Sequence, residues 1–404
     1  MFWLVETPEQ FEELRYKGFK QVYLEVVPSL DYISCIFIAT PQGKYILSIN
    51  HSEALSLEID PVLEWLKGME KIQVRNKVDT IQYLPFKNIE DISMQTSHPT
   101  ILPSIFQDIQ SRTHNINYTA PISKVFEKCD AAYEKVKHLQ YKQYYDFYNT
   151  KASIVFGALS KNGIPIDTKL FEDKYEYKPP SDQIYPEYNF KTATRRPSCL
   201  YNGINFLALN KEDGSREVIK PKNDCVIEID ISAYHPTILA NLIGYNFGGE
   251  NIHQHFANLY GVDYKKAKEL TFKQLYGGIF EEYKNIEFFK QAQAFIDKLY
   301  QKYNQQGYIE SPISKWRFEK EILGEIKPQK LFNYLLQEIE TSQNIGLMWE
   351  IFKTLNGKNS YLFLYVYDAF VFDWDTKEDI EEVVSIFKKR GLVTTIKTGE
   401  TYNL

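Results

Sequence analysis

Four cysteines in 404 residues, none of them in a CxxC pair, exclude a disulfide framework and provide no zinc-binding pattern. The chain also lacks any run of 18 or more apolar residues. Its first residues, MFWLVETPEQFEEL, carry acids where a signal peptide would carry Lys or Arg. We therefore expect no membrane association, a cytoplasmic location, and buried thiols at Cys35, Cys129, Cys199 and Cys225.

An excess of positive charge is also missing. The formal net charge is -6, so binding of a nucleic acid would depend on local basic patches. A composition of 44% hydrophobic and 25% charged residues indicates a globular protein with room for two or three domains. Aromatic residues make up 15% of the chain, which suits base-stacking surfaces and ordinary cores equally. Composition alone therefore leaves the function open.

The order of periodic segments predicts the fold class. Residues 20–49 alternate β-branched and aromatic residues around the turn signals PSLD and PQGK, which predicts a three-stranded antiparallel meander. Residues 52–69 and 121–163 have helical spacing, the latter ending at Gly163. Residues 174–200 are rich in Pro, Tyr and basic residues and resemble a linker. Helical blocks at 262–306 and 328–355 and a final helix and strand at 377–391 and 392–399 follow. Strands and helices thus mix without βαβ alternation, which favours an α+β fold with an antiparallel sheet.

Two acids at apolar strands are the first candidates for chemistry. CVIEIDIS, 225–232, predicts a strand that ends near Asp230, and YVYDAFVFDW, 365–374, predicts one strand with Asp368 in its middle. If the two strands are neighbours, the carboxylates converge, and two Mg²⁺ ions are the usual solution for phosphoryl chemistry. The alternative is that each Asp ends a strand by accepting backbone N–H bonds.

A third candidate segment lies between these two strands in the sequence. In KKAKELTFKQLYGGIF, residues Lys268, Phe272 and Tyr276 are spaced four apart and line one face of a predicted helix. That face suits a triphosphate at the lysine and a base or sugar on the rings. The alternative is a helix face whose two aromatic residues lie in the core.

At these positions the sequence resembles the family A (DNA polymerase I type) DNA polymerases, in particular their small phage forms. DISAYHPTILA, 230–240, is similar to the family's first metal-binding motif, and VYDA, 366–369, to its third. Lys268, Phe272, Tyr276 and Gly277 match the nucleotide-binding helix. TATRRPSCLYNGINFLAL, 192–209, and NYLLQ, 333–337, are similar to its primer- and template-contacting segments. The resemblance covers roughly 190–404 and implies a right-hand polymerase palm with helical fingers.

The resemblance implies a template-directed DNA polymerase that adds dNTPs to a primer 3′-OH. It implies that Asp230, Asp368 and the backbone carbonyl of Ile231 bind two Mg²⁺ ions. Lys268 and Lys265 are then expected at the triphosphate, Phe272 and Tyr276 on the incoming nucleotide, and His235 at its sugar. Contacts with DNA are expected from Arg195, Arg196, Asn205 and Gln337. The expected partners are primer-template DNA, dNTPs and a processivity or replication protein, in the host cytoplasm if a phage encodes the chain.

The N-terminal part resembles the family's 3′–5′ exonuclease domain, an RNase H-like α/β fold. SLDYIS, NKVD and FEKCD are similar to its motif regions, with Asp79 and Asp130 as remnants. The first motif places Leu24 and Val26 where two acids bind metal, which predicts an inactive exonuclease. We expect an exonuclease-like domain at 1–150, a connecting helix and thumb remnant at 151–190, and palm and fingers at 191–404. Only residues 168–191 remain for the thumb, so the thumb is expected to be largely missing.

Departures from the family keep other functions open. Tyr264 replaces an Arg, with Lys265 and Lys266 beside it, and His235 replaces the Glu that closes off the sugar. Tyr367 and Ala369 replace the His and Glu that flank the third-motif Asp. His235 also suits a core position, and Arg195 and Arg196 also suit a solvated pair. The rival interpretations are a single-subunit RNA polymerase or primase-like enzyme, a family B polymerase, and a decayed replication-associated DNA-binding protein.

Overall fold

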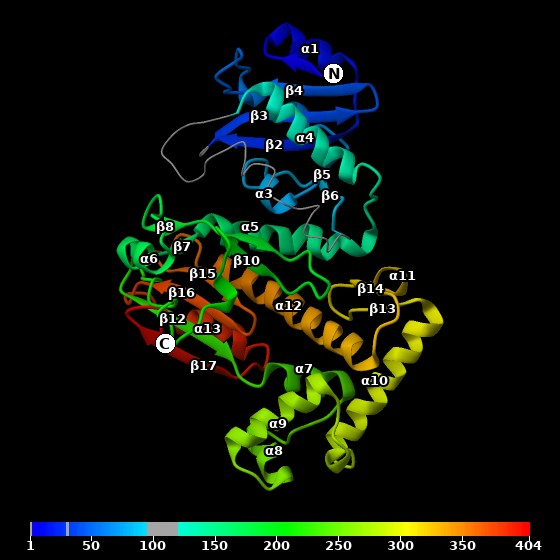
Figure 1. Cartoon of the computed structure of the whole chain (residues 1–404), viewed down its shortest axis with the longest axis vertical. Helices are drawn as coiled ribbons and strands as arrows, with labels where there is room; N and C mark the ends of the chain where they lie inside the picture. Colours follow the sequence, from blue (N-terminus) through cyan, green and yellow to red (C-terminus); the bar gives the residue numbers. More distant parts are fainter. Residues whose placement is uncertain (1, 30–31, 95–119) are drawn as a thin grey trace. The chain divides into compact units, whose positions relative to one another are not determined.

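The computed structural model describes residues 2–29, 32–94 and 120–404 (Figure 1). The chain forms two compact units, Met1–Thr192 and Ala193–Leu404. Each unit has its own sheet and its own helices.

The first unit is built on a six-stranded mixed sheet of order β1-β4-β3-β2-β5-β6. β2, β3 and β4 pair antiparallel, which confirms the meander predicted for residues 20–49. The other pairs, β1 with β4, β2 with β5 and β5 with β6, are parallel. The strands are β1 Trp3–Val5, β2 Gln21–Ser29, β3 Tyr32–Thr40, β4 Gly43–Ser48, β5 Lys71–Val74 and β6 Ile89–Asp91.

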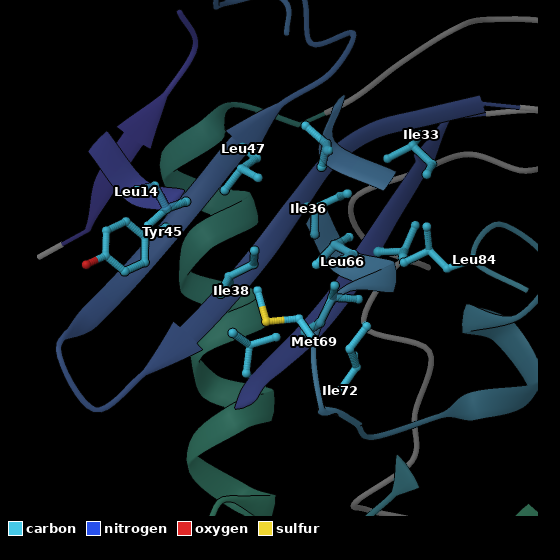
Figure 2. Close-up of a cluster of buried hydrophobic side chains, with 14 of the residues drawn as sticks. Leu14, Ile33, Ile36, Ile38, Tyr45, Leu47, Leu66, Met69, Ile72 and Leu84 are labelled. Carbon is cyan, nitrogen blue, oxygen red and sulfur yellow. The ribbon is translucent and has the colours of Figure 1, made fainter. Parts of the chain in front are cut away.

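The two faces of this sheet bury different clusters. Figure 2 shows one of them, in which side chains of β2–β5 such as Ile36 and Ile72 pack with Leu14 of α1 and Leu66 of α2. On the other face Tyr23, Val27 and Phe37 pack against α4. The helices are α1 Pro8–Tyr16, α2 Ile59–Lys67, α3 Lys77–Thr80 and α4 Ile122–Val136. α2 is shorter than the helix predicted at 52–69.

The remainder of the first unit is helical with short strands. The helical pattern at 121–163 proves to be two helices, α4 and α5, separated by turns and a single π-helical stretch at Tyr148–Ala152. Gly163 ends α5 at φ 67°, and a Cβ there would lie 2.7 Å from the carbonyl oxygen of Ile184. Residues 168–191 contain one helix of eight residues and no helical hairpin, as predicted from the length of this interval. The elements are α5 Ser153–Asn162, β7 Ile164–Pro165, α6 Thr168–Tyr175, β8 Gln183–Ile184 and β9 Glu187–Asn189.

The second unit centres on a four-stranded sheet of order β15-β16-β12-β17, in which every neighbouring pair is antiparallel. The predicted α+β class with an antiparallel sheet is therefore confirmed. β12 lies in the middle and pairs Asp230 with Ala369 on one side and with Thr395 on the other. The strands are β12 Cys225–Ile231, β15 Tyr361–Val366, β16 Ala369–Trp374 and β17 Thr394–Gly399.

A 27-residue helix, α12, organises the helices around this sheet (Figure 1). It contacts α7, α9, α10, α13 and β15, and it buries apolar residues along most of its length. The helices are α7 Tyr234–Ile243, α8 Ile252–Tyr260, α9 Tyr264–Gly277, α10 Glu287–Gln306, α11 Lys320–Leu323, α12 Pro328–Thr354 and α13 Glu381–Lys388. The short strands are β10 Ser198–Tyr201, β11 Ile204–Asn205, β13 Tyr308–Glu310 and β14 Arg317–Glu319. Within the described ranges, none of the helices is both long and apolar enough to cross a bilayer.

The segment YVYDAFVFDW is a hairpin and not the single strand that its alternation predicts. β15 ends at Val366, β16 begins at Ala369, and Val366 pairs with Ala369 across a two-residue turn. Tyr367 takes φ 59° in that turn, the left-handed region that a two-residue hairpin needs at its first position. Asp368 therefore projects from the tip of a hairpin rather than from the middle of a strand.

Candidate active site

Two carboxylates from different elements converge at one end of the four-stranded sheet of the second unit. Asp230 is the penultimate residue of β12, and Asp368 is the second residue of the β15–β16 turn. The N–H of Ile231 donates to the carbonyl oxygen of Asp368 at 2.8 Å, which fixes the turn against the end of β12. Because Asp230 and Ala369 are cross-strand neighbours, the two acids lie side by side, as the sequence predicts.

The electrostatics of this pair suit a cation. Burial, the charge of Asp368 and the charge of Glu228 raise the pKa of Asp230 to about 6, against opposing charges on Lys397 and Lys268. Burial and the charge of Glu340 raise the pKa of Asp368. Among the described residues neither acid has a salt-bridge partner, and no cluster of three or more metal-binding side chains occurs there. Two carboxylates with this geometry fit a hard divalent cation that keeps several other oxygen ligands.

Helix α9 presents the predicted row of side chains. Asp263 caps its N-terminus by accepting from the N–H of Lys266. Lys268 is exposed, and its charge lowers the pKa of Asp230, so the amine acts on the carboxylate site. Phe272 and Tyr276 stack with ring centroids 6.0 Å apart and nearly parallel planes. Lys265 is exposed on the first turn of the same helix.

Tyr276 of α9 is joined to α7 and α12 through His235 and Glu340. The Tyr276 hydroxyl lies 2.6 Å from Nδ1 of His235, and Nε2 of His235 lies 3.1 Å from a carboxylate oxygen of Glu340. Tyr276 is 39% exposed, whereas His235 and Glu340 are buried. Burial and the charge of Glu340 raise the pKa of Tyr276 to about 12. Sequence reasoning missed Glu340, although an acid within the apolar pattern of α12 was a signal.

Arg196 forms an ion pair with the carboxylate of Glu340. Its Nη2 lies 3.0 and 2.9 Å from the two oxygens of Glu340, and its guanidinium lies 3.9 Å from the ring centroid of Tyr367. Asn344 donates to the carbonyl oxygen of Tyr367 at 2.7 Å, so α12 also fixes the turn that carries Asp368. Burial alone would raise the pKa of Glu340, but the hydrogen bonds and charges of His235 and Arg196 lower it. Glu340 is therefore ionised at neutral pH.

The other residues predicted to contact DNA differ in their solvent exposure. Arg195 is 2% exposed, and its guanidinium stacks 3.5 Å from the ring centroid of buried Trp316. The guanidinium of Arg195 therefore packs inside the second unit, and its contact with DNA stays a prediction. Asn205 is exposed, and its side chain accepts from the N–H of Leu207. Gln337 is half-buried on α12, one turn before Glu340.

The first unit holds a separate group of acids. Leu24 and Val26 point into the cluster opposite α4, whereas Tyr23 faces α4, so Glu25 faces α4 as well. Glu25 accepts from the Tyr23 hydroxyl at 2.5 Å and from Nε of Arg75 at 3.1 Å. Both members of this ion pair are almost fully buried. Leu24 and Val26 therefore lie in an apolar cluster, and Glu25 is an acid on the α4 face between them.

The two predicted remnant acids also have partners within the chain. Asp79 accepts from Nδ2 of Asn76 at 2.7 Å, and it lines a pocket with Glu25 and Arg75. Asp130 of α4 forms an ion pair with Lys44 of β4. Arg75 and Lys44 therefore supply positive charge beside these acids from within the protein.

The fold of the chain is the mixed α+β fold of the polymerase domain of a DNA polymerase. The solved structure that shows it is the "POL domain of Pol1 from M. smegmatis complex with DNA primer-template and dNTP". The two match with a TM-score of 0.69 over 99% of each chain, at 11% sequence identity. No protein-family model matches the sequence, and no curated protein does.

Proposed function

We propose that this protein is a template-directed DNA polymerase of the family A type, which adds dNTPs to a primer 3′-OH. The observation that carries the proposal is the convergence of Asp230 and Asp368, two carboxylates without a cationic partner among the described side chains, beside the exposed Lys268. The polymerase-domain fold supports it. A nucleotidyl transfer needs this combination, because negative charge accumulates on the transferred phosphoryl group and the leaving pyrophosphate.

Asp230 and Asp368, with the backbone carbonyl of Ile231, are the residues that would hold two Mg²⁺ ions. Bound there, such ions supply Lewis-acid charge neutralisation for phosphoryl transfer. Lys268, with Lys265 one turn earlier, binds the triphosphate through exposed amines. The ring of Phe272 and that of Tyr276 form a stacked surface for the incoming nucleotide, with His235 behind the phenol.

The residues proposed to contact primer and template are Arg196, Gln337 and Asn205. Arg196 lies beside the Asp368 turn and keeps 26% of its side chain exposed. Gln337 on α12 and Asn205 on β11 are polar side chains at the surface. Phosphate contacts would position the duplex, and amide contacts would reach base edges. With only α6 in the interval of the thumb, we expect low processivity, or a partner protein that supplies the grip on duplex DNA.

The first unit is proposed as an exonuclease-like domain without catalysis. Glu25 is neutralised by Arg75, and Asp130 by Lys44. A carboxylate that is already paired with a buried guanidinium is a poor ligand for a divalent ion, because the ion would have to displace a cation that cannot leave.

The test is primer extension by the purified protein with Mg²⁺ and a labelled primer-template. We expect extension with dNTPs that requires the template, and its loss in Asp230→Asn and in Asp368→Asn. Asp297→Asn, at an exposed acid on α10, serves as the matched control. Extension that is unchanged in both active-site variants would exclude the catalytic assignment.

The same assay separates the alternatives. Efficient extension with rNTPs in place of dNTPs would favour the single-subunit RNA polymerase interpretation, for which His235 in the sugar-facing position is the supporting feature. Binding of primer-template with no extension under any nucleotide would favour a decayed DNA-binding protein, which Tyr367 and Ala369 beside Asp368 would explain.

A further inference from the structure

We propose that Glu340 is a positioning residue of the polymerase site, which orients the Tyr276 phenol through His235 and holds Arg196 against the turn that carries Asp368. This inference rests on the proposed function. It concerns a buried acid of α12 that contacts neither the carboxylate pair nor the exposed face of α9. Its effect on the reaction is therefore transmitted through two other side chains.

The first connection fixes the hydrogen-bonding pattern of Tyr276. The ionised carboxylate of Glu340 only accepts hydrogen bonds, so Nε2 of His235 carries a hydrogen and donates to it at 3.1 Å. Nδ1 of the same ring lies 2.6 Å from the Tyr276 hydroxyl, so the phenol and Glu340 are joined by one imidazole. The hydroxyl of Tyr276 is thereby held toward His235 and Glu340, and its ring stacks with Phe272.

The second connection fixes Arg196. Glu340 contacts its Nη2 with both oxygens, and the guanidinium covers the ring of Tyr367. Tyr367 is the residue with positive φ in the two-residue turn, and Asn344, one helical turn after Glu340, holds its carbonyl oxygen. One carboxylate thus joins the nucleotide side of the site to the side that carries Asp368.

A neutral amide cannot replace this carboxylate. The side chain that Glu340→Gln introduces has the same shape, but its NH₂ group can donate to Nε2 of His235. Nε2 of His235 then no longer has to donate to position 340, which loosens the connection to Tyr276, and Arg196 loses its counter-charge. Glu340→Gln therefore tests the role of the negative charge at this position, because it leaves the packing unchanged.

The test compares Glu340→Gln with a matched control, Glu338→Gln. Glu338 is also a buried acid of α12, but it accepts from Ser314 instead. We expect Glu340→Gln to raise the KM for dNTP about tenfold, the effect of losing one hydrogen bond to a charged group, and to change kcat less than threefold. Glu338→Gln should leave KM within about twofold. Thermal unfolding of both variants reports any general loss of stability.

A double-mutant cycle shows whether Glu340 acts through the tyrosine. Tyr276→Phe removes the hydroxyl, so adding Glu340→Gln to it should raise KM little further, whereas independent effects would multiply. Multiplying effects, or equal KM values in the Glu340→Gln and Glu338→Gln variants, would overturn the proposal.

A readout without catalysis separates this inference from the proposed function. With 3-fluorotyrosine at position 276, Glu340→Gln should shift the ¹⁹F resonance and lower the pKa of the phenol, and Glu338→Gln should do neither. A parent protein that does not extend primers, but shows this shift, would refute the polymerase proposal and retain Glu340 as the positioning residue. An unshifted resonance in an active enzyme would refute the role of Glu340 alone.

Discussion

Replacing Asp230 by Asn should stabilise the protein while abolishing its activity. Burial and neighbouring acids raise the pKa of Asp230 from 3.8 to about 6 in the folded chain. A carboxyl whose folded pKa is raised holds its proton more tightly in the folded state. Folding therefore loses stability as the pH rises from the unfolded pKa through the folded one, and above pH 6 the full penalty is present.

The magnitude follows from the shift. About two pKa units correspond to roughly 3 kcal/mol, and solvent screening at this partly exposed carboxylate reduces the figure to roughly 1–2 kcal/mol. Asn has no charge to lose, so Asp230→Asn should be more stable than the parent by that amount at pH 8. At pH 5 the folded carboxyl is mostly protonated, and the gain should fall to about half.

Urea unfolding in EDTA at pH 8 and pH 5 measures both values. Asp224→Asn is a control of opposite sign, because hydrogen bonds from Thr376 lower the pKa of Asp224 and favour its ionised form in the folded state. Adding Mg²⁺ at pH 8 should stabilise the parent and not Asp230→Asn. A loss of stability in Asp230→Asn at both pH values, or an equal gain at both, would refute the reasoning.

Three further predictions concern the charged side chains. Arg75→Met leaves the buried Glu25 without its cation and should cost about 3–5 kcal/mol in urea unfolding; adding Glu25→Gln should recover most of it, and no recovery would contradict the pairing. Lys268→Ala should raise the KM for dNTP about tenfold with little change in melting temperature, and an unchanged KM would remove Lys268 from the triphosphate site. Arg196→Lys loses the planar stack on Tyr367 and should weaken primer-template binding several-fold by fluorescence anisotropy; equal affinity would exclude the contact.

Long periodic segments made much of the second unit predictable. The apolar run of β12, the 328–355 helix pattern and the final helix and strand correspond closely to β12, α12, α13 and β17. The hairpin at 365–374 was not predictable in the same way. A two-residue turn preserves the period of two, and Tyr367 and Asp368 carry none of the Gly or Asn that normally marks such a turn. The strained φ of Tyr367 is imposed by contacts from α12 and Arg196 that are distant in sequence.

Strand register and contacts between residues distant in sequence also limited what could be predicted. A shift of one residue in β2 exchanges the two faces of the sheet, and β2 has such a register shift between Val27 and Pro28, directly before SLDYIS. Glu340 was missed because its partners, His235 and Arg196, are 105 and 144 residues away in sequence. The spacing of Asn333, Gln337, Glu340 and Asn344 along α12, at steps of four, three and four, was the available sign of a polar face.

The distribution of buried charge supports the placement of the active site independently of the fold. Four buried acids have a cation supplied by the chain: Glu25 has Arg75, Asp91 has Lys191, Glu228 has Lys397 and Glu340 has Arg196. Three others, Glu338, Asp373 and Asp375, accept hydrogen bonds from neutral groups. A buried carboxylate without such a partner is costly. Asp230 is half-buried and Asp368 is exposed at its turn, yet both have raised pKa values and no ion pair among the described residues. Under the proposed function, a divalent cation that arrives with the substrate would neutralise both carboxylates.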